Sequence, residues 1–227
     1  MATRGGFQAR DDARHWLPTQ GVDPAPLAEL NAECLGLLVM CAAERESAGT
    51  LPPMLAALRA QWARLPTPAV RRLAAAPYSL FDAGFAGAPR WLEQRGRGVH
   101  DQQLRSEARY FELAAARSIT RRMLVYGWHL ARSRPRAACL VFGITIPAAE
   151  ALAACSLTAL DAAAEANAGT LRPRWTHQPA FWRALLESAS DAADVRLQEL
   201  LLGGIQRLAA ETLAAHSPDS NTHAYFR

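Results

Sequence analysis

The stretch at residues 139–167, CLVFGITIPAAEALAACSLTALDAAAEAN, decides the fold class of this chain. A helix-like run stops at Gly143, and two short Ala-rich helical segments follow, each opened by a hydroxyl residue, Thr145 and Ser156. Glycine tolerates the positive φ of a tight turn, and Ser and Thr side chains cap helix N-termini. The stretch therefore predicts short helices joined by tight turns, which could either read DNA or hold another protein.

Helical patterning extends outward from this stretch in both directions. Apolar residues recur at three- and four-residue spacing, which predicts helices at 23–46, 47–65, 67–76, 102–133 and 180–215. Alanine is abundant and β-branched residues are sparse, which favours helix over sheet. We expect an all-α, multi-helix globular protein with almost no β-structure, whose last helix bends at Gly203 and Gly204.

Composition and turn residues divide the 227-residue chain into parts. Polar, charged residues predict a mobile tail at 1–22 and a polar tail at 217–227. A connector, QRGRGVHD at 94–101, separates an N-terminal helical domain at 23–100 from a C-terminal helical domain at 101–216.

A weak internal sequence repeat relates the two predicted domains at a separation of 90 residues. Ala69 and Val70 fall on Ala159 and Leu160, and three positions of an aromatic–proline loop also match. These three are Phe85, Pro89 and Trp91, which fall on Trp175, Pro179 and Phe181. This weak repeat fits either a duplicated helical unit or chance matches in an Ala-rich chain.

The charge and the cysteine content bear on two kinds of function, nucleic-acid binding and metal binding. All 25 positive side chains are arginine, as in a protein from a GC-rich genome, so the net charge of +4 alone is weak support for nucleic-acid binding. The cysteines, at 34, 41, 139 and 155, form no C-x-x-C pair, which indicates buried reduced thiols and no zinc site.

No apolar signal segment opens the chain, and the uncharged run at 137–149 is too short and too broken to cross a bilayer. We therefore expect a cytoplasmic protein with no membrane contact.

No sequence motif indicates an enzyme. G-x-G-x-x-G, the P-loop, H-E-x-x-H and G-x-S-x-G are all absent from the sequence. None of the six histidines has a Cys, His or carboxylate partner at ligand spacing, and His129 lies beside Trp128 in the long helix. We expect neither catalytic residues, nor a metal, nor a cofactor.

An arginine cluster spans the predicted helix 102–133 and the loop after it. Between Glu112 and Glu150 there is no acidic residue. The cluster consists of Arg117, Arg121, Arg122, Arg132, Arg134 and Arg136. Two interpretations stay open: a solvated surface near a helix C-terminus, or a patch for phosphate or an acidic partner.

The spacing around Gly143 is that of a helix-turn-helix, but the segment IPAAEALAA lacks residues that read bases. Direct readout needs Arg, Lys, Asn or Gln at the exposed face, and this segment offers only Glu150. Its nearly all-round apolar character predicts a buried helix, with Ala149 and Leu152 facing inward.

The run at 138–175 resembles the flagellar transcriptional activator subunit FlhD, and a weaker likeness covers 105–215. Gly143–Ile144 and the AEAN segment carry most of the resemblance, with Thr145 and Leu152 completing the turn and core. The matching residues are Ala138, Gly143, Ile144, Ala149, Leu152, Ala153, Ala154, Leu157, Ala164, Glu165, Asn167, Arg174 and Trp175.

The resemblance implies an all-α protein that forms a homodimer through intertwined helices and joins a partner subunit, FlhC. In that family the complex binds promoter DNA, and the FlhC-type subunit supplies the zinc site. This chain departs from the family in its N-terminal 100 residues, and in carrying Leu171 where a family member can carry an inter-subunit cysteine.

We therefore expect a non-enzymatic, FlhD-like regulatory subunit of a transcription complex that acts through protein–protein contacts. The alternatives are a direct DNA binder that uses the arginine-rich region 113–149, and an unrelated helical adaptor.

Overall fold

The computed structural model describes residues 23–44, 51–85, 109–191 and 194–214. The all-α prediction is confirmed, because the β-structure of these ranges is limited to β1 (Phe81–Asp82) and β2 (Arg172–Pro173), which pair antiparallel. The tails predicted at 1–22 and 217–227 and the connector at 94–101 lie outside the described residues.

The N-terminal part begins with the long helix α1 (Ala25–Glu44), where the Asp23 carboxylate accepts a hydrogen bond from the Ala25 N–H at 2.9 Å. Three short helices follow, α2 (Pro53–Ala57), α3 (Arg59–Ala63) and α4 (Thr67–Ala74). Proline stands in the first turn of α2 and of α4, where its missing N–H costs nothing.

The C-terminal part begins with the second long helix, α7 (Leu113–Ser133), which is shorter than predicted. Tyr110 and Phe111 are buried in the core ahead of the helix, and residues 102–108 are outside the described part of the chain. Helices α8 (Pro135–Phe142), α9 (Ile146–Ala153) and α10 (Leu157–Asn167) follow, and a 3-10 turn, η3 (Ala168–Thr170), leads into β2.

The last predicted helix, at 180–215, is two helices in the structure. They are α11 (Pro179–Ser190) and α12 (Asp194–Ala214). Asp191 has an extended backbone, with φ −81° and ψ 144°, and this conformation ends α11.

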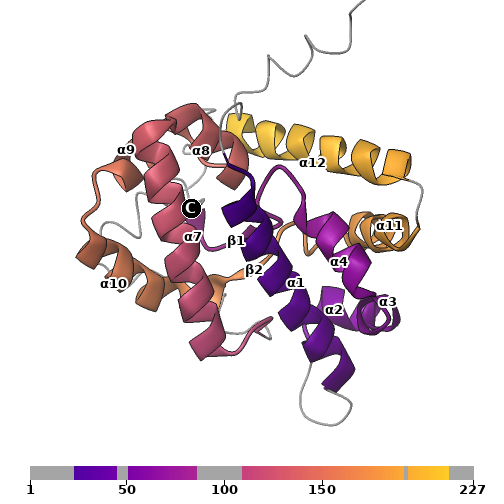
Figure 1. Ribbon diagram of the computed structural model, residues 1–227. Coiled ribbons are helices and arrows are strands. Elements are labelled where there is room, and N and C mark those ends of the chain that lie inside the picture. Colours follow the sequence, from indigo (N-terminus) through magenta and orange to yellow (C-terminus); the bar gives the residue numbers. More distant parts are fainter. Residues whose placement is uncertain (1–22, 45–50, 86–108, 192–193, 215–227) are drawn as a thin grey trace, which may run out of the picture.

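The two long helices, α1 and α7, lie next to each other at the centre of the molecule (Figure 1). α9 and α10 flank α7 on one side, α3 and α4 flank α1 on the other, and the strand pair lies between them. One hydrophobic cluster contains residues from both predicted domains, and the Trp62 and Trp182 rings lie 5.5 Å apart within it. The two predicted domains therefore share a core.

A buried amide fixes the segment between α4 and β1. The Asn31 side chain, on α1, donates to the carbonyls of Ala74 at 3.3 Å and Tyr78 at 3.1 Å, and accepts from the Leu80 N–H at 3.0 Å. Buried polar groups must be paired, so this amide supplies the partners that a non-helical segment in the core would otherwise lack.

One helix of the described residues, α1, is long and apolar enough to span a membrane by length and composition: Ala25–Ala43 has a mean hydropathy of 1.4. A bent pair, α8 and α9, passes the same test together with an angle of 113° between its helices. In this fold α1 is a central helix, with Leu35 and Leu38 fully buried in the core.

Gly204 admits a close approach between α12 and Tyr78. A Cβ atom at Gly204 would lie 1.8 Å from the Tyr78 hydroxyl oxygen, whereas a Cβ at Gly203 would meet nothing within 4 Å. α12 continues as one helix through both glycines, so the Gly204 position serves packing and not a break.

These neighbouring glycines give a matched pair of variants. Gly204→Ala should lower the free energy of unfolding by about 1–3 kcal/mol, because the Tyr78 ring is buried and cannot move aside freely. Gly203→Ala should raise it by about 0.5–1 kcal/mol through helix propensity. Urea unfolding of both variants measures the difference, and equal effects would contradict the Tyr78–α12 contact.

Candidate functional site

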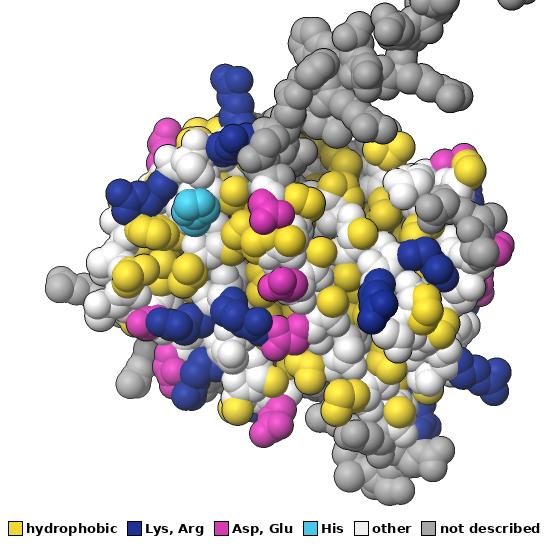
Figure 2. Space-filling model, viewed as in Figure 1, with side chains coloured by type: hydrophobic (Ala, Val, Ile, Leu, Met, Phe, Trp, Pro, Cys, Tyr) yellow, Lys and Arg dark blue, Asp and Glu magenta, His cyan; other side chains and the backbone are white. Residues whose placement is uncertain are grey.

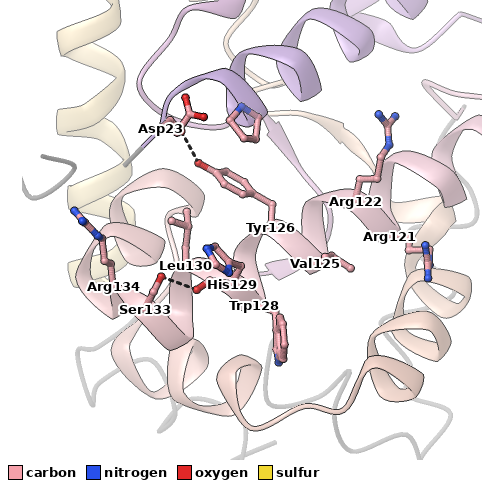
Figure 3. Close-up of a pocket in the computed structure, with 11 residues that line it drawn as sticks. Asp23, Arg121, Arg122, Val125, Tyr126, Trp128, His129, Leu130, Ser133 and Arg134 are labelled. Carbon is pink, nitrogen blue, oxygen red and sulfur yellow. Dashed lines mark hydrogen bonds between the residues drawn. The ribbon is translucent and has the colours of Figure 1, made fainter. Parts of the chain in front are cut away.

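A half-open groove of about 670 Å³ runs along the outer face of α7 beside the start of α1. Figure 3 shows Tyr126 and His129 side by side in it, with Arg134 toward one end and Arg122 toward the other. The lining residues are Asp23, Pro26, Arg121, Arg122, Val125, Tyr126, Trp128, His129, Leu130, Ser133 and Arg134. The groove thus has an apolar and aromatic floor with basic residues at its edges.

The aromatic side chains of the groove are held in place by polar contacts. The Tyr126 hydroxyl donates to the Asp23 carbonyl oxygen at 3.4 Å, and the Trp128 indole N–H donates to the Cys155 carbonyl at 3.0 Å. The Arg132 guanidinium lies 4.7 Å from the centre of the Trp128 ring, a cation–π contact. Burial, and then the Asp23 carboxylate, raise the pKa of Tyr126.

Several groove residues, among them Arg122 and His129, were named from the sequence, but it was not predicted that they line one groove with Tyr126. Arg122, Tyr126, His129 and Ser133 follow one another at spacings of four, three and four residues, which places them on one face of a helix. That spacing was the available signal, and it would have placed the histidine and the tyrosine on one surface.

Three arginines of the sequence cluster are engaged in ion pairs. Arg117 pairs with Glu165 at 2.6 Å and Arg121 with Asp161 at 2.5 Å, both on α10, and Arg122 pairs with Glu33 on α1. Arginine and acidic side chains accordingly alternate over this region (Figure 2). The acid-free span in the sequence is therefore balanced in space by carboxylates from other helices.

The other three arginines gather at the junction of α7 and α8. Arg132 lies in the last turn of α7, Arg134 is the residue between the helices, and Arg136 lies in the first turn of α8. All three are exposed. Cations are favourable at the C-terminus of α7 but not at the N-terminus of α8, so the helix dipoles account for Arg132 and leave Arg136 without such a reason.

The turn around Gly143 has the geometry that its sequence predicts. Gly143 has φ 59° and ψ 40°, and the Ile144 N–H donates to the Cys139 carbonyl at 3.2 Å to close α8. The Thr145 hydroxyl accepts from the Ala148 N–H at 3.3 Å and caps α9. Ser156 caps α10 in the same way, accepting from the Ala159 N–H at 3.2 Å.

Helix α9 is buried along the face that was predicted to point inward. Ala149 and Leu152 have no exposed surface, and Ile144 just before the helix is 2% exposed. The side chains on its exposed face are Ile146, Pro147, Glu150 and Ala154, none of which donates a hydrogen bond to a base edge.

Glu165 and Asn167, the two polar residues of the AEAN segment, have structural contacts. Glu165 is the partner of Arg117, and the Asn167 amide donates to the Ala163 carbonyl at 2.8 Å. The Asn167 carbonyl accepts from the Thr170 hydroxyl at 2.8 Å. These bonds end α10 and start η3.

Arg174 is a buried cation that ties the Gly143 turn to the rest of the core. Its Nε donates to the Ser79 carbonyl at 2.9 Å, and its terminal nitrogen donates to the Phe142 carbonyl at 2.5 Å. The Trp182 indole N–H donates to the Arg174 carbonyl at 2.6 Å. Burial lowers the pKa of Arg174, and the carboxylates of Asp82 and Glu211 oppose that shift.

No three His, Cys, Asp or Glu side chains come together to hold a metal ion in the part of the chain that the structure describes. None of the four cysteines forms a disulfide. The prediction that all four are buried is correct for Cys34 alone, since Cys41, Cys139 and Cys155 are half-buried. Burial raises the pKa of Cys34, Cys139 and Cys155.

In comparisons with known proteins, no family model, curated protein or solved structure matches this chain.

The burial of α9 makes a direct prediction. Leu152→Asp should unfold the protein or lower its melting temperature sharply, because it places an unpaired charge in the core. Ala154→Asp, at an exposed position two residues away, should leave the melting temperature nearly unchanged. Circular dichroism on heating measures both, and a folded Leu152→Asp protein would contradict the buried placement of α9.

Arg174→Met should lower the free energy of unfolding by about 3 kcal/mol, because it leaves the buried Ser79 and Phe142 carbonyls without donors. Arg172→Met, two residues earlier in β2 and partly exposed, is the matched control and should cost less than about 1 kcal/mol. Denaturant titration of both variants measures the difference, and similar losses would show that the buried guanidinium bonds are unimportant.

Proposed function

We propose that this protein is a non-enzymatic, FlhD-like regulatory subunit that acts through protein–protein contacts in a transcription-regulating complex. Its partner is an FlhC-like protein, and contact with promoter DNA is made through the complex. The α7 groove, together with Arg132, Arg134 and Arg136, is the face that binds the partner.

The groove carries this proposal. Its floor offers the partly exposed rings of Tyr126 and Trp128, and its edges are basic. Aromatic residues and arginine are the side chains most enriched at the centres of protein interfaces. A floor and rim of this kind fit an amphipathic helix of a partner, with apolar residues on one face and carboxylates on the other.

The exposed face of α9 favours a protein partner over direct DNA readout. It presents apolar residues and Glu150, whose charge repels phosphate. A helix that entered the major groove would need donors and acceptors at those positions.

Direct DNA binding remains the second candidate, and one observation favours it. Arg132, Arg134 and Arg136 lie within five residues on the exposed junction of α7 and α8. Three guanidinium groups in such proximity suit phosphate contact without base readout.

Replacing these three arginines by serine separates the two candidates. We expect the variant to keep its melting temperature and to bind a labelled acidic amphipathic helical peptide about tenfold more weakly, since three rim charges contribute a few tenths to one kcal/mol each. A triple variant with the same change in charge elsewhere, Arg64, Arg71 and Arg183 to serine, should bind the peptide as the parent does.

The same titration with a labelled DNA duplex tests the alternative. We expect the chain alone to bind DNA no more tightly than non-specific complexes do, on the order of 10⁻⁴–10⁻⁶ M. Duplex binding well below that range, lost in the Arg132/Arg134/Arg136 variant and steeply dependent on salt, would favour the direct DNA binder.

A further inference from the structure

The two parts of the fold contain the same elements in the same order. A long helix is followed by short helices, by a helix that packs on the long one, and by a two-residue strand. In the first part α1 packs against α3 and α4, and in the second α7 packs against α9 and α10. In Figure 1 these sets lie on opposite sides of the strand pair, as if exchanged by a half-turn about an axis between α1 and α7.

The buried positions of the long helices coincide at a constant separation of 89 residues. All seven buried residues of α1 have a buried counterpart on α7, and Asn31 and Thr120, the buried polar residues of these two helices, fall on each other. The α1 residues are Leu27, Leu30, Asn31, Cys34, Leu35, Leu38 and Ala42. Their counterparts are Ala116, Ile119, Thr120, Met123, Leu124, Gly127 and Ala131.

Any two amphipathic helices can be matched in some phase, so the strands were compared as well. Phe81 pairs with Pro173 and Asp82 pairs with Arg172. A separation of 91 residues makes Phe81 equivalent to Arg172 and Asp82 to Pro173. Every antiparallel pair has local two-fold symmetry, so the strands are compatible with the axis and do not by themselves establish it.

Backbone conformation after the strands repeats at the same separation. Gly84 has φ +83° and Trp175 has φ +52°, and these residues are 91 apart. Within the described residues Trp175 is the one non-glycine residue with positive φ, a conformation that such residues rarely adopt. Between helix and strand, the buried pair Leu73–Ala74 of α4 falls on Ala163–Ala164 of α10 at a separation of 90.

An ion pair marks where the axis passes. Glu33 and Arg122 are equivalent positions, 89 apart, and they pair with each other. In an isologous contact, a residue on the two-fold axis meets its own counterpart. Two identical copies would place like charges there, whereas two copies in one chain are free to carry opposite charges.

We infer that residues 25–84 and 113–175 are two copies of one unit, packed about a two-fold axis as the protomers of a homodimer would be. The α1–α7 seam at this axis is an interaction surface whose partner is the chain's own other half. The homodimer that the likeness to FlhD implies then has its two-fold contact within a single chain.

The two copies differ most in charge on their outer faces. Arg117, Arg121 and Arg132 of α7 stand where α1 has Ala28, Ala32 and Ala43. At these three positions the positive charge belongs to the second copy alone, so the two outer faces of the fold are not equivalent in charge.

Thr120 provides a test of equivalence in the full-length protein. Its hydroxyl is buried without a hydrogen-bond partner in the structure, whereas Asn31 at the equivalent position bonds the α4–β1 segment. If the halves are copies, the segment between α10 and β2 offers the same backbone groups to an amide at 120. Thr120→Asn should then melt about 3 °C or more above Thr120→Leu, because the leucine side chain has about the same shape as asparagine but no polar atoms to bond these groups.

An asparagine variant that melts at or below the leucine variant would overturn the inference, because a buried amide without partners is costly. Asn31→Leu measures how much such an amide contributes at the equivalent position. It should melt well below the parent protein, because it removes the bonds to Ala74, Tyr78 and Leu80.

The seam itself is tested by sedimentation of the full chain at micromolar concentrations. A mass of one chain, 24.7 kDa, supports the internal seam. A two-chain mass that reverts to one chain in Glu33→Arg would overturn it, because the seam would then join different chains. A two-chain mass unchanged by Glu33→Arg would place that contact on another surface and support the internal seam.

Discussion

The buried guanidinium of Arg174 is the constraint on which much of this fold depends. It lies where the segment before β1, the end of α8 and the start of α11 meet, and it supplies donors to backbone carbonyls that no helix or strand satisfies. A neutral donor could bond one of these carbonyls, but the planar guanidinium reaches two that come from distant parts of the sequence. Burying that charge is costly, and the bonds to Ser79 and Phe142, together with the carboxylates of Asp82 and Glu211, offset the cost.

The surface of the central helix α7 has two parts, one that packs against neighbouring helices and one that lines the groove. Its inner face and flanks pack against α1, α8, α9 and α10, and its arginines at 117, 121 and 122 hold those neighbours by ion pairs. What remains is the open groove along Tyr126, His129, Ser133 and Arg134, beside the start of α1. The groove thus lies on a rigid element, which suits a surface that must recognise a partner with a fixed shape.

Local patterns in the sequence predicted the helices and the Gly143 turn well, because periodicity, capping residues and glycine conformation are local properties. The Thr145 cap, the positive φ of Gly143 and the burial of Leu152 all follow from neighbours within a few residues. The helix predicted at 102–133 begins at Leu113 in the structure, because Tyr110 and Phe111 are buried in the core, where the Phe111 ring lies 6.0 Å from the Phe81 ring. This contact with a residue remote in sequence is a non-local effect. The arginine cluster illustrates the same limit: its balancing acids, Glu33, Asp161 and Glu165, are remote in sequence, so no count along the chain could pair them.

The seam between α1 and α7 also bears on how the protein responds to dilution. Two separate chains held by such a contact dissociate when their concentration falls below the dissociation constant. Two halves on one chain meet at an effective concentration that does not depend on the amount of protein in the cell. A seam whose axis carries a partly exposed ion pair, Glu33 with Arg122, can therefore remain closed without the large apolar area that an obligate dimer needs.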